Sequence, residues 1–97
     1  MRYVMLVNQV SLGLNCCHSQ VSVWQGEVLG SHQAFVSGWF PNNKSQVLIQ
    51  QLAMADRIRI VAGPETKLRV LHDGNTGFFP GEELPVSEFI KKVKRRL

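Results

Sequence analysis

The residues best suited to chemistry in this sequence are His72 and Asp73, which follow a segment rich in cations. That segment carries Arg57, Arg59, Lys67 and Arg69. An imidazole can move a proton, and arginine or lysine side chains can stabilise negative charge on a phosphate. This set of residues would suit a small nuclease that needs no metal. The alternative, which we favour, is that His72-Asp73-Gly74 is a strand end that enters a turn.

Cys16 and Cys17 are the only cysteines, and they are adjacent in the sequence. Adjacent cysteines do not reach the geometry of an ordinary disulfide without strain. A zinc site would need two spaced ligand pairs, and no second pair accompanies Cys16, Cys17 and His18. In a strand His18 would point away from Cys17, so it would not activate that thiol. We therefore expect no metal, no cofactor and no cysteine nucleophile.

The charge distribution favours an acidic partner. The chain of 97 residues has eleven Lys and Arg against seven Asp and Glu, which gives a formal net charge of +4 and a pI near 9.5. Arg2 and Glu27 are the only charged residues before Lys44. A basic balance of this kind indicates acidic partners without naming them. The uncharged first part could also offer an edge strand to a second copy, so a homo-oligomer is a further expectation.

The N-terminal residues have some of the features of a signal peptide. Arg2 precedes a short apolar run, but Asn8 and Gln9 interrupt it before it reaches the usual length. We expect a first strand here and a cytoplasmic protein, with a signal peptide as the alternative. No run of about 18 apolar residues exists, so no membrane span is predicted.

Period-two alternation of apolar and polar residues predicts strands over 2–7, 20–25 and 33–40, and residues 10–14 alternate in the same way. A short strand is also predicted at Phe78 and Phe79, before Pro80-Gly81. Two segments have the period of an amphipathic helix. They are residues 45–55, which follow N-cap candidates near Asn43, and residues 86–97, which follow Pro85.

Residues 57–61 and 67–71 alternate strictly around Gly63-Pro64, and this pattern predicts a hairpin. Its core face would carry Ile58, Ile60, Leu68 and Val70. Either register that buries both apolar sets puts Arg59 opposite a second cation, Arg69 or Lys67. Like charges that face each other are unfavourable, by a few tenths of a kcal/mol in water. The hairpin would therefore present either a solvated basic face or one that an acidic partner covers.

These patterns predict one α+β domain spanning residues 1–97. It would contain an antiparallel sheet of about five strands, packed against helices near 45–55 and 86–97. The expected function is that of a small non-enzymatic interaction module, which binds an acidic protein surface through the basic hairpin face. Nucleic-acid binding is the alternative, and a metal-independent nuclease is the third hypothesis. The predicted partner-binding residues are Arg57, Arg59, Lys67, Arg69, Lys91, Lys94 and Arg95.

Overall fold

The computed structural model describes residues 3–11, 17–26, 33–41, 43–72, 77–79 and 81–97. Three long strands come first along the chain, and helices and shorter strands follow. The elements are β1 (Tyr3–Ser11), β2 (Cys17–Gln25), β3 (Gln33–Pro41), α1 (Lys44–Ala62), β4 (Lys67–His72), β5 (Glu82–Pro85) and α2 (Val86–Arg96).

The strands form one mixed sheet in the order β3-β2-β1-β4-β5. Neighbouring strands are antiparallel except for β1 and β4, which are parallel. The predicted α+β class is therefore confirmed, and the prediction of a wholly antiparallel sheet is wrong. The difference follows from the connection between β3 and β4. Both strands run in the same direction, so the chain needs a long crossover between them, and α1 supplies it.

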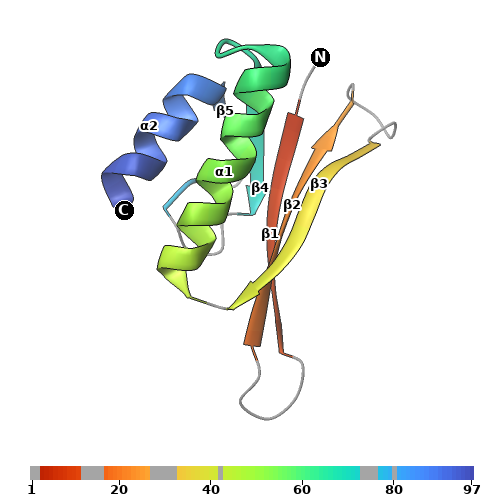
Figure 1. The fold of residues 1–97 in the computed structure, drawn as a ribbon, viewed down its shortest axis with the longest axis vertical. Coiled ribbons are helices and arrows are strands. Elements are labelled where there is room, and N and C mark those ends of the chain that lie inside the picture. Colours follow the sequence, from red (N-terminus) through yellow and green to blue (C-terminus); the bar gives the residue numbers. More distant parts are fainter. Residues whose placement is uncertain (1–2, 12–16, 27–32, 42, 73–76, 80) are drawn as a thin grey trace.

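Both helices pack on the same face of the sheet (Figure 1). Alternate residues of the strands point into this layer, among them Tyr3, Met5 and Val7 of β1. They form one hydrophobic core with residues of the helices, including Ile58 of α1 and Phe89 of α2. The three strands predicted from alternation are confirmed, and in β1 and β2 alternate side chains such as Met5 and Val23 are buried beneath the helices.

Helix α1 begins where the sequence predicts and ends later than expected. The side chain of Asn43 accepts hydrogen bonds from the backbone N–H groups of Ser45 and Gln46, at 2.9 and 3.3 Å. This is the N-cap arrangement that asparagine favours. At the other end Gly63 has a φ of 99°, and its N–H donates to the carbonyl of Arg59 at 2.9 Å. Glycine adopts this positive φ at little cost, and the proline that follows does not continue the helix.

The predicted strand at 57–61 is wrong, because these residues form the last part of α1. The buried residues of α1 recur at helical spacing and end at Ile58. Ile60 and Val61 would lie on opposite faces of a strand, but both are exposed on the helix. The basic hairpin therefore does not exist, although its second segment is a strand, β4.

Helix α2 at Val86–Arg96 agrees with the helix predicted at 86–97. The short strand predicted at Phe78 and Phe79 is wrong, because the strand in this region is β5 at Glu82–Pro85. Phe78 is buried instead, and its ring stacks on Phe89 with 4.6 Å between the ring centroids. Its neighbour Phe79 is 78% exposed, so only one of the two phenylalanines enters the core.

Candidate functional site

The structure divides the seven predicted partner-binding cations between two sides of the molecule. Arg57 and Arg59 are exposed on α1. Lys67 and Arg69 are exposed on β4, where they alternate with Leu68 and Val70, which are fully buried under the helices. Because side chains alternate along a strand, Lys67 and Arg69 lie on the sheet face that the helices do not cover. The two pairs therefore do not form the common face that a hairpin would have given them.

The cations of α2 join those of α1. Val86, Phe89 and Val93 are buried against the core, and Lys91, Lys94 and Arg95 are exposed on the outer side of the helix. Five of the seven predicted cations thus share the helical layer. We use the name helical surface for one group of exposed side chains of this layer. Its cationic and apolar members are Ile49, Ala53, Arg57, Arg59, Ile60, Val61, Lys91, Lys94 and Arg95.

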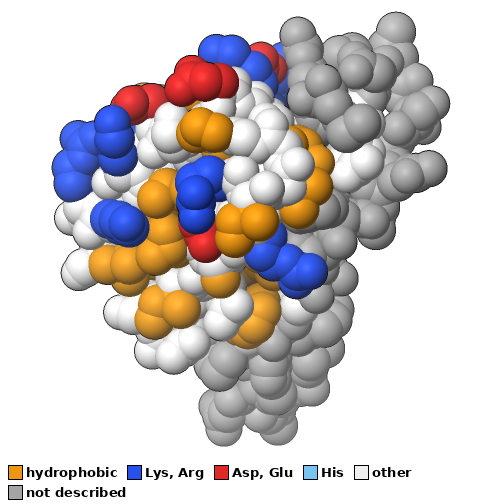
Figure 2. Space-filling model, turned by 45° about the horizontal axis from the view of Figure 1, so that its top comes forward, with side chains coloured by type: hydrophobic (Ala, Val, Ile, Leu, Met, Phe, Trp, Pro, Cys, Tyr) orange, Lys and Arg blue, Asp and Glu red, His pale blue; other side chains and the backbone are white. Residues whose placement is uncertain are grey.

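Hydrophobic side chains lie among these cations. Ile60 is 68% exposed and Val61 is 67% exposed, and Ile49 is 43% exposed. Ile49, Ala53 and Ile60 recur at spacings of four and seven, which places them along one stripe of α1. Figure 2 shows orange hydrophobic side chains interspersed with blue Lys and Arg side chains on this side of the molecule. The helical surface is therefore mixed: Asp56 falls on the same stripe as Ile49, Ala53 and Ile60, and cations lie beside it.

Two of the five cations are neutralised within their own helix. The Nε of Arg59 lies 2.8 Å from Asp56, and the Nζ of Lys91 lies 3.5 Å from Glu88. Both pairs are about half exposed, so each contributes little to stability. Among the described residues, no ion pair engages Arg57, Lys94 or Arg95. The helical surface thus keeps a net positive charge.

A second surface is the sheet face without helices, which we call the open sheet face. Val4 pairs with Trp24 of β2 and with Arg69 of β4, and Arg69 pairs with Glu83 of β5. These four residues form a row across four strands, because paired residues share a face. Trp24 is 37% exposed, and Arg69 lies 3.3 Å from Glu83. Sequence analysis missed this row because the parallel pairing of β1 and β4 is not visible in local patterns.

The indole of Trp24 is held against the open sheet face. Its Nε1 donates to the hydroxyl of Ser22 at 3.2 Å, and that hydroxyl donates to the carbonyl of Leu6 at 3.4 Å. A fixed indole needs little further ordering when a ligand binds, so this surface offers one rigid aromatic contact.

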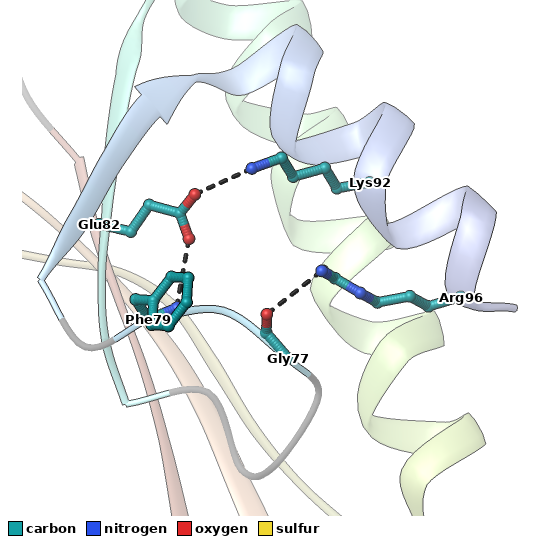
Figure 3. A network of polar contacts seen from close by, with 5 residues as sticks. All are labelled: Gly77, Phe79, Glu82, Lys92 and Arg96. Carbon is teal, nitrogen blue, oxygen red and sulfur yellow. Dashed lines mark hydrogen bonds and ion pairs between the residues drawn. The ribbon is translucent and has the colours of Figure 1, made fainter.

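Lys92 and Arg96 point from α2 toward the start of β5 and the segment before it (Figure 3). Arg96 donates to the carbonyl of Gly77 at 3.2 Å, and its guanidinium lies 4.4 Å from the centroid of the Phe78 ring. Lys92 donates to Glu82 at 2.9 Å. These two cations therefore have a structural role.

The carboxylate of Glu82 has a second donor, the N–H of Phe79 at 3.2 Å. The hydrogen bond from Lys92 is the largest of the effects that lower the pKa of Glu82 below its ordinary value of 4.5, and partial burial opposes them. A lowered pKa in the folded protein means that the bond contributes stability above pH 4.5. This contribution disappears as the pH falls through the folded-state pKa.

We expect the Lys92→Met variant to be less stable than the wild type by about 0.5–1 kcal/mol at pH 7. The difference should shrink as the pH falls through the folded-state pKa of Glu82, because the carboxylate then becomes protonated and the ion pair with Lys92 is lost. Urea unfolding at a series of pH values measures it. Lys91→Met is the matched control, because Lys91 and Glu88 are more exposed than Lys92 and Glu82. A constant difference between wild type and Lys92→Met across this pH range would contradict the proposed role of Glu82.

The hypotheses of a nuclease and of a metal site concern side chains outside the described part of the chain. Cys16 and Asp73 belong to residues that are not described, and the side chains of Cys17, His18 and His72 are not described either. Within the described residues, no group of three or more His, Cys, Asp or Glu side chains could hold a metal ion.

Among the described residues, neither helix has both the length and the hydropathy of a membrane-spanning segment. The described residues form two candidate sites, the helical surface and the open sheet face. Comparisons with protein-family models, curated proteins and solved structures find no match for this chain.

Proposed function

We propose that the protein is a small, non-enzymatic interaction module, which binds an acidic protein surface through the helical surface. The observation that carries this proposal is the exposure of Ile60 and Val61, at 68% and 67%, next to Arg57. Five of the seven cations predicted to bind a partner lie on α1 and α2, although the predicted hairpin is absent.

The first argument is that α1 has apolar residues on both sides. One side is buried in the core and ends at Ile58, and the other bears Ile49, Ala53 and Ile60. A protein partner would cover the outer stripe of α1, and clustered exposed apolar side chains are typical of such contacts.

The second argument is electrostatic. Arg57, Lys94 and Arg95 have no ion pair among the described residues, while Asp56 and Glu88 neutralise other cations of this surface. A partner with carboxylates around an apolar strip would complement both features. Such complementarity raises the association rate and the specificity, and it weakens at high salt.

A synthetic amphipathic helical peptide with leucines along one stripe and glutamates beside it is a suitable probe. We expect it to bind the wild-type protein, and we expect Arg57→Glu combined with Lys94→Glu to weaken binding about tenfold or more, because two attractive charge contacts become repulsive. Isothermal calorimetry or fluorescence anisotropy at low salt measures the change. The same peptide with lysine in place of glutamate should not bind.

The matched control combines Lys67→Glu with Arg69→Glu, which changes the net charge by the same amount on the open sheet face. This control should lose no more than about twofold in affinity through the long-range field. An equal loss of affinity for the peptide in the two double variants would show that net charge alone attracts it. That result would contradict a role for the helical surface.

Nucleic-acid binding is a second candidate, and one observation favours it. Trp24 is partly exposed on the same face as Lys67 and Arg69. Aromatic side chains on a sheet face can stack on single-stranded bases, with cations beside them contacting phosphates. A single-stranded oligonucleotide used in place of the peptide distinguishes the two functions. Binding that Trp24→Ala and the Lys67/Arg69 double variant abolish, but the Arg57/Lys94 double variant does not, would support the second.

A further inference from the structure

We propose that the protein binds the surface of an anionic lipid bilayer through Phe79 and the three cations in the last turn of α2, which are Lys94, Arg95 and Arg96. We call these four residues the basic tip. This inference goes beyond the proposed function, because Phe79 lies outside the helical surface. Lys94 and Arg95 belong to both surfaces, so the test of the inference rests on Phe79.

Phe79 is the most exposed of the large hydrophobic side chains in the part of the chain that the structure describes, at 78%. Its backbone is held in place, because its N–H donates to the carboxylate of Glu82 at 3.2 Å and its carbonyl accepts from the N–H of Glu82 at 3.0 Å. The preceding residue, Phe78, is anchored in the core by its stacking on Phe89. The ring of Phe79 is therefore kept in solvent by an ordered turn, and its backbone needs little further ordering when a ligand binds.

Arg96 connects this turn to the last turn of α2. Its guanidinium donates to the carbonyl of Gly77 at 3.2 Å and lies 4.4 Å from the centroid of the Phe78 ring. Figure 3 shows the side chain of Arg96 reaching from the helix to the segment that contains Gly77 and Phe79. The cations in the last turn of α2 therefore lie beside the residues that immediately precede Phe79.

The charge at this place is positive and is not neutralised. The first turn of α2 contains Glu88, but the last turn has only basic charged residues. Among the residues that the structure describes, no ion pair engages Lys94, Arg95 or Arg96. The contacts of Arg96 with a carbonyl and a ring are contacts with uncharged groups, so its positive charge remains.

An exposed aromatic ring next to several cations is complementary to an anionic bilayer. Proteins that lie on bilayers bury apolar side chains such as Phe in the interface, and their Lys and Arg side chains attract anionic lipids. Each cation near such a surface contributes about fivefold in affinity. A fluid interface also admits a protruding ring without a matching pocket, whereas a protein partner would have to provide one. These features select the bilayer as the occupant of the basic tip.

Sedimentation with lipid vesicles tests this inference. At low salt, we expect the wild-type protein to bind vesicles of phosphatidylcholine that contain about 30% phosphatidylserine, and to bind vesicles of phosphatidylcholine alone at least about tenfold more weakly. Phe79→Ala should lower the affinity for the anionic vesicles about fivefold or more, because no ring then enters the interface. The variant should keep the stability of the wild type, since the side chain of Phe79 lies outside the core.

Ile60→Ala is the matched control, because Ile60 is an apolar residue of the helical surface with a similar exposure, 68%. It should keep the affinity for anionic vesicles within about twofold. Phe79→Ala should in turn keep the affinity for the acidic peptide, so a failure of this inference is distinguishable from a failure of the proposed function. Equal vesicle affinities of the wild type and Phe79→Ala would overturn the inference, as would an equal loss in Ile60→Ala. So would a wild-type protein that does not sediment with anionic vesicles at about 5 mM lipid.

Two further measurements separate a bilayer from a soluble anion. Free glycerophosphoserine, at the same concentration as the phosphatidylserine, should not displace the protein from the vesicles, and displacement would overturn the inference. In a Phe79→Trp variant, lipids with brominated acyl chains should quench the tryptophan emission more than they quench that of the wild type, because the indole at position 79 enters the interface. Equal quenching in the two proteins would contradict the role of Phe79.

Discussion

Replacing Ile58 by alanine lowers the free energy of unfolding by about 2–5 kcal/mol, whereas replacing Ile60 by alanine changes it by no more than about 0.5 kcal/mol. The reason lies in the two positions on α1. Ile58 is fully buried in the core, and Ile60 is 68% exposed. Removing methyl groups from a buried site leaves a cavity in the core. At an exposed site, water fills the space that the methyl groups occupied, so no cavity forms.

Urea unfolding followed by circular dichroism measures both variants under the same conditions. They are matched in chemistry and in helix propensity, because each changes isoleucine to alanine within one helix. A hairpin over residues 57–71 would bury Ile58 and Ile60 on one face. Both alanine variants would then have a much lower free energy of unfolding. Two similar losses would therefore contradict the fold of this segment.

Replacing Gln51 by methionine raises the free energy of unfolding by about 1–2 kcal/mol. Gln51 is fully buried in α1, and neither its Nε2 nor its Oε1 has a hydrogen-bond partner among the described residues. A buried polar group that lacks a partner costs about 1–3 kcal/mol. Methionine has nearly the same volume and no group to desolvate, so it removes this cost and leaves the packing intact.

Gln50→Met is the matched control for this prediction, because Gln50 is adjacent and only half-buried. We expect it to change the stability by no more than about 0.5 kcal/mol. Thermal and urea unfolding should agree on the order of the three proteins. A clear loss of stability in Gln51→Met would show that the buried amide is satisfied in the folded protein.

Alternation in the sequence was sufficient to predict the first three strands. In β1 the residues Tyr3, Met5 and Val7 are buried, while Val4 and Leu6 between them are only partly covered. The same held for α2, where the apolar positions Val86, Phe89 and Val93 enter the core. In both elements, one face is core and the other is not, so the period of the apolar residues reports the structure directly.

The end of α1 was mispredicted because its outer side is apolar. Ile60 and Val61 are exposed and make no contact in the core. Because they are apolar and follow Arg57 and Arg59, the segment has the sequence pattern of a strand. The signal that could have corrected the prediction is Gly63-Pro64, which suits a helix terminus as well as a turn. The exposed apolar side chains of Ile60 and Val61 therefore explain why a strand was predicted here, and they are also the main feature of the candidate site.

The order and pairing of the strands were not predicted, for a different reason. The pairing of β1 with β4 joins residues more than sixty positions apart, such as Tyr3 and Leu68. No local pattern carries that information. The row of Trp24, Val4, Arg69 and Glu83 on the open sheet face therefore became visible only once the strand order was known.

The account depends most on the path of residues 57–62, and backbone NMR of the wild-type protein tests it directly. If α1 reaches Ala62, the Cα shifts of these residues lie downfield of random coil, and strong contacts join successive amide protons. Upfield Cα shifts, with cross-strand contacts from residues 57–61 to residues 67–71, would instead restore the hairpin and remove the helical surface.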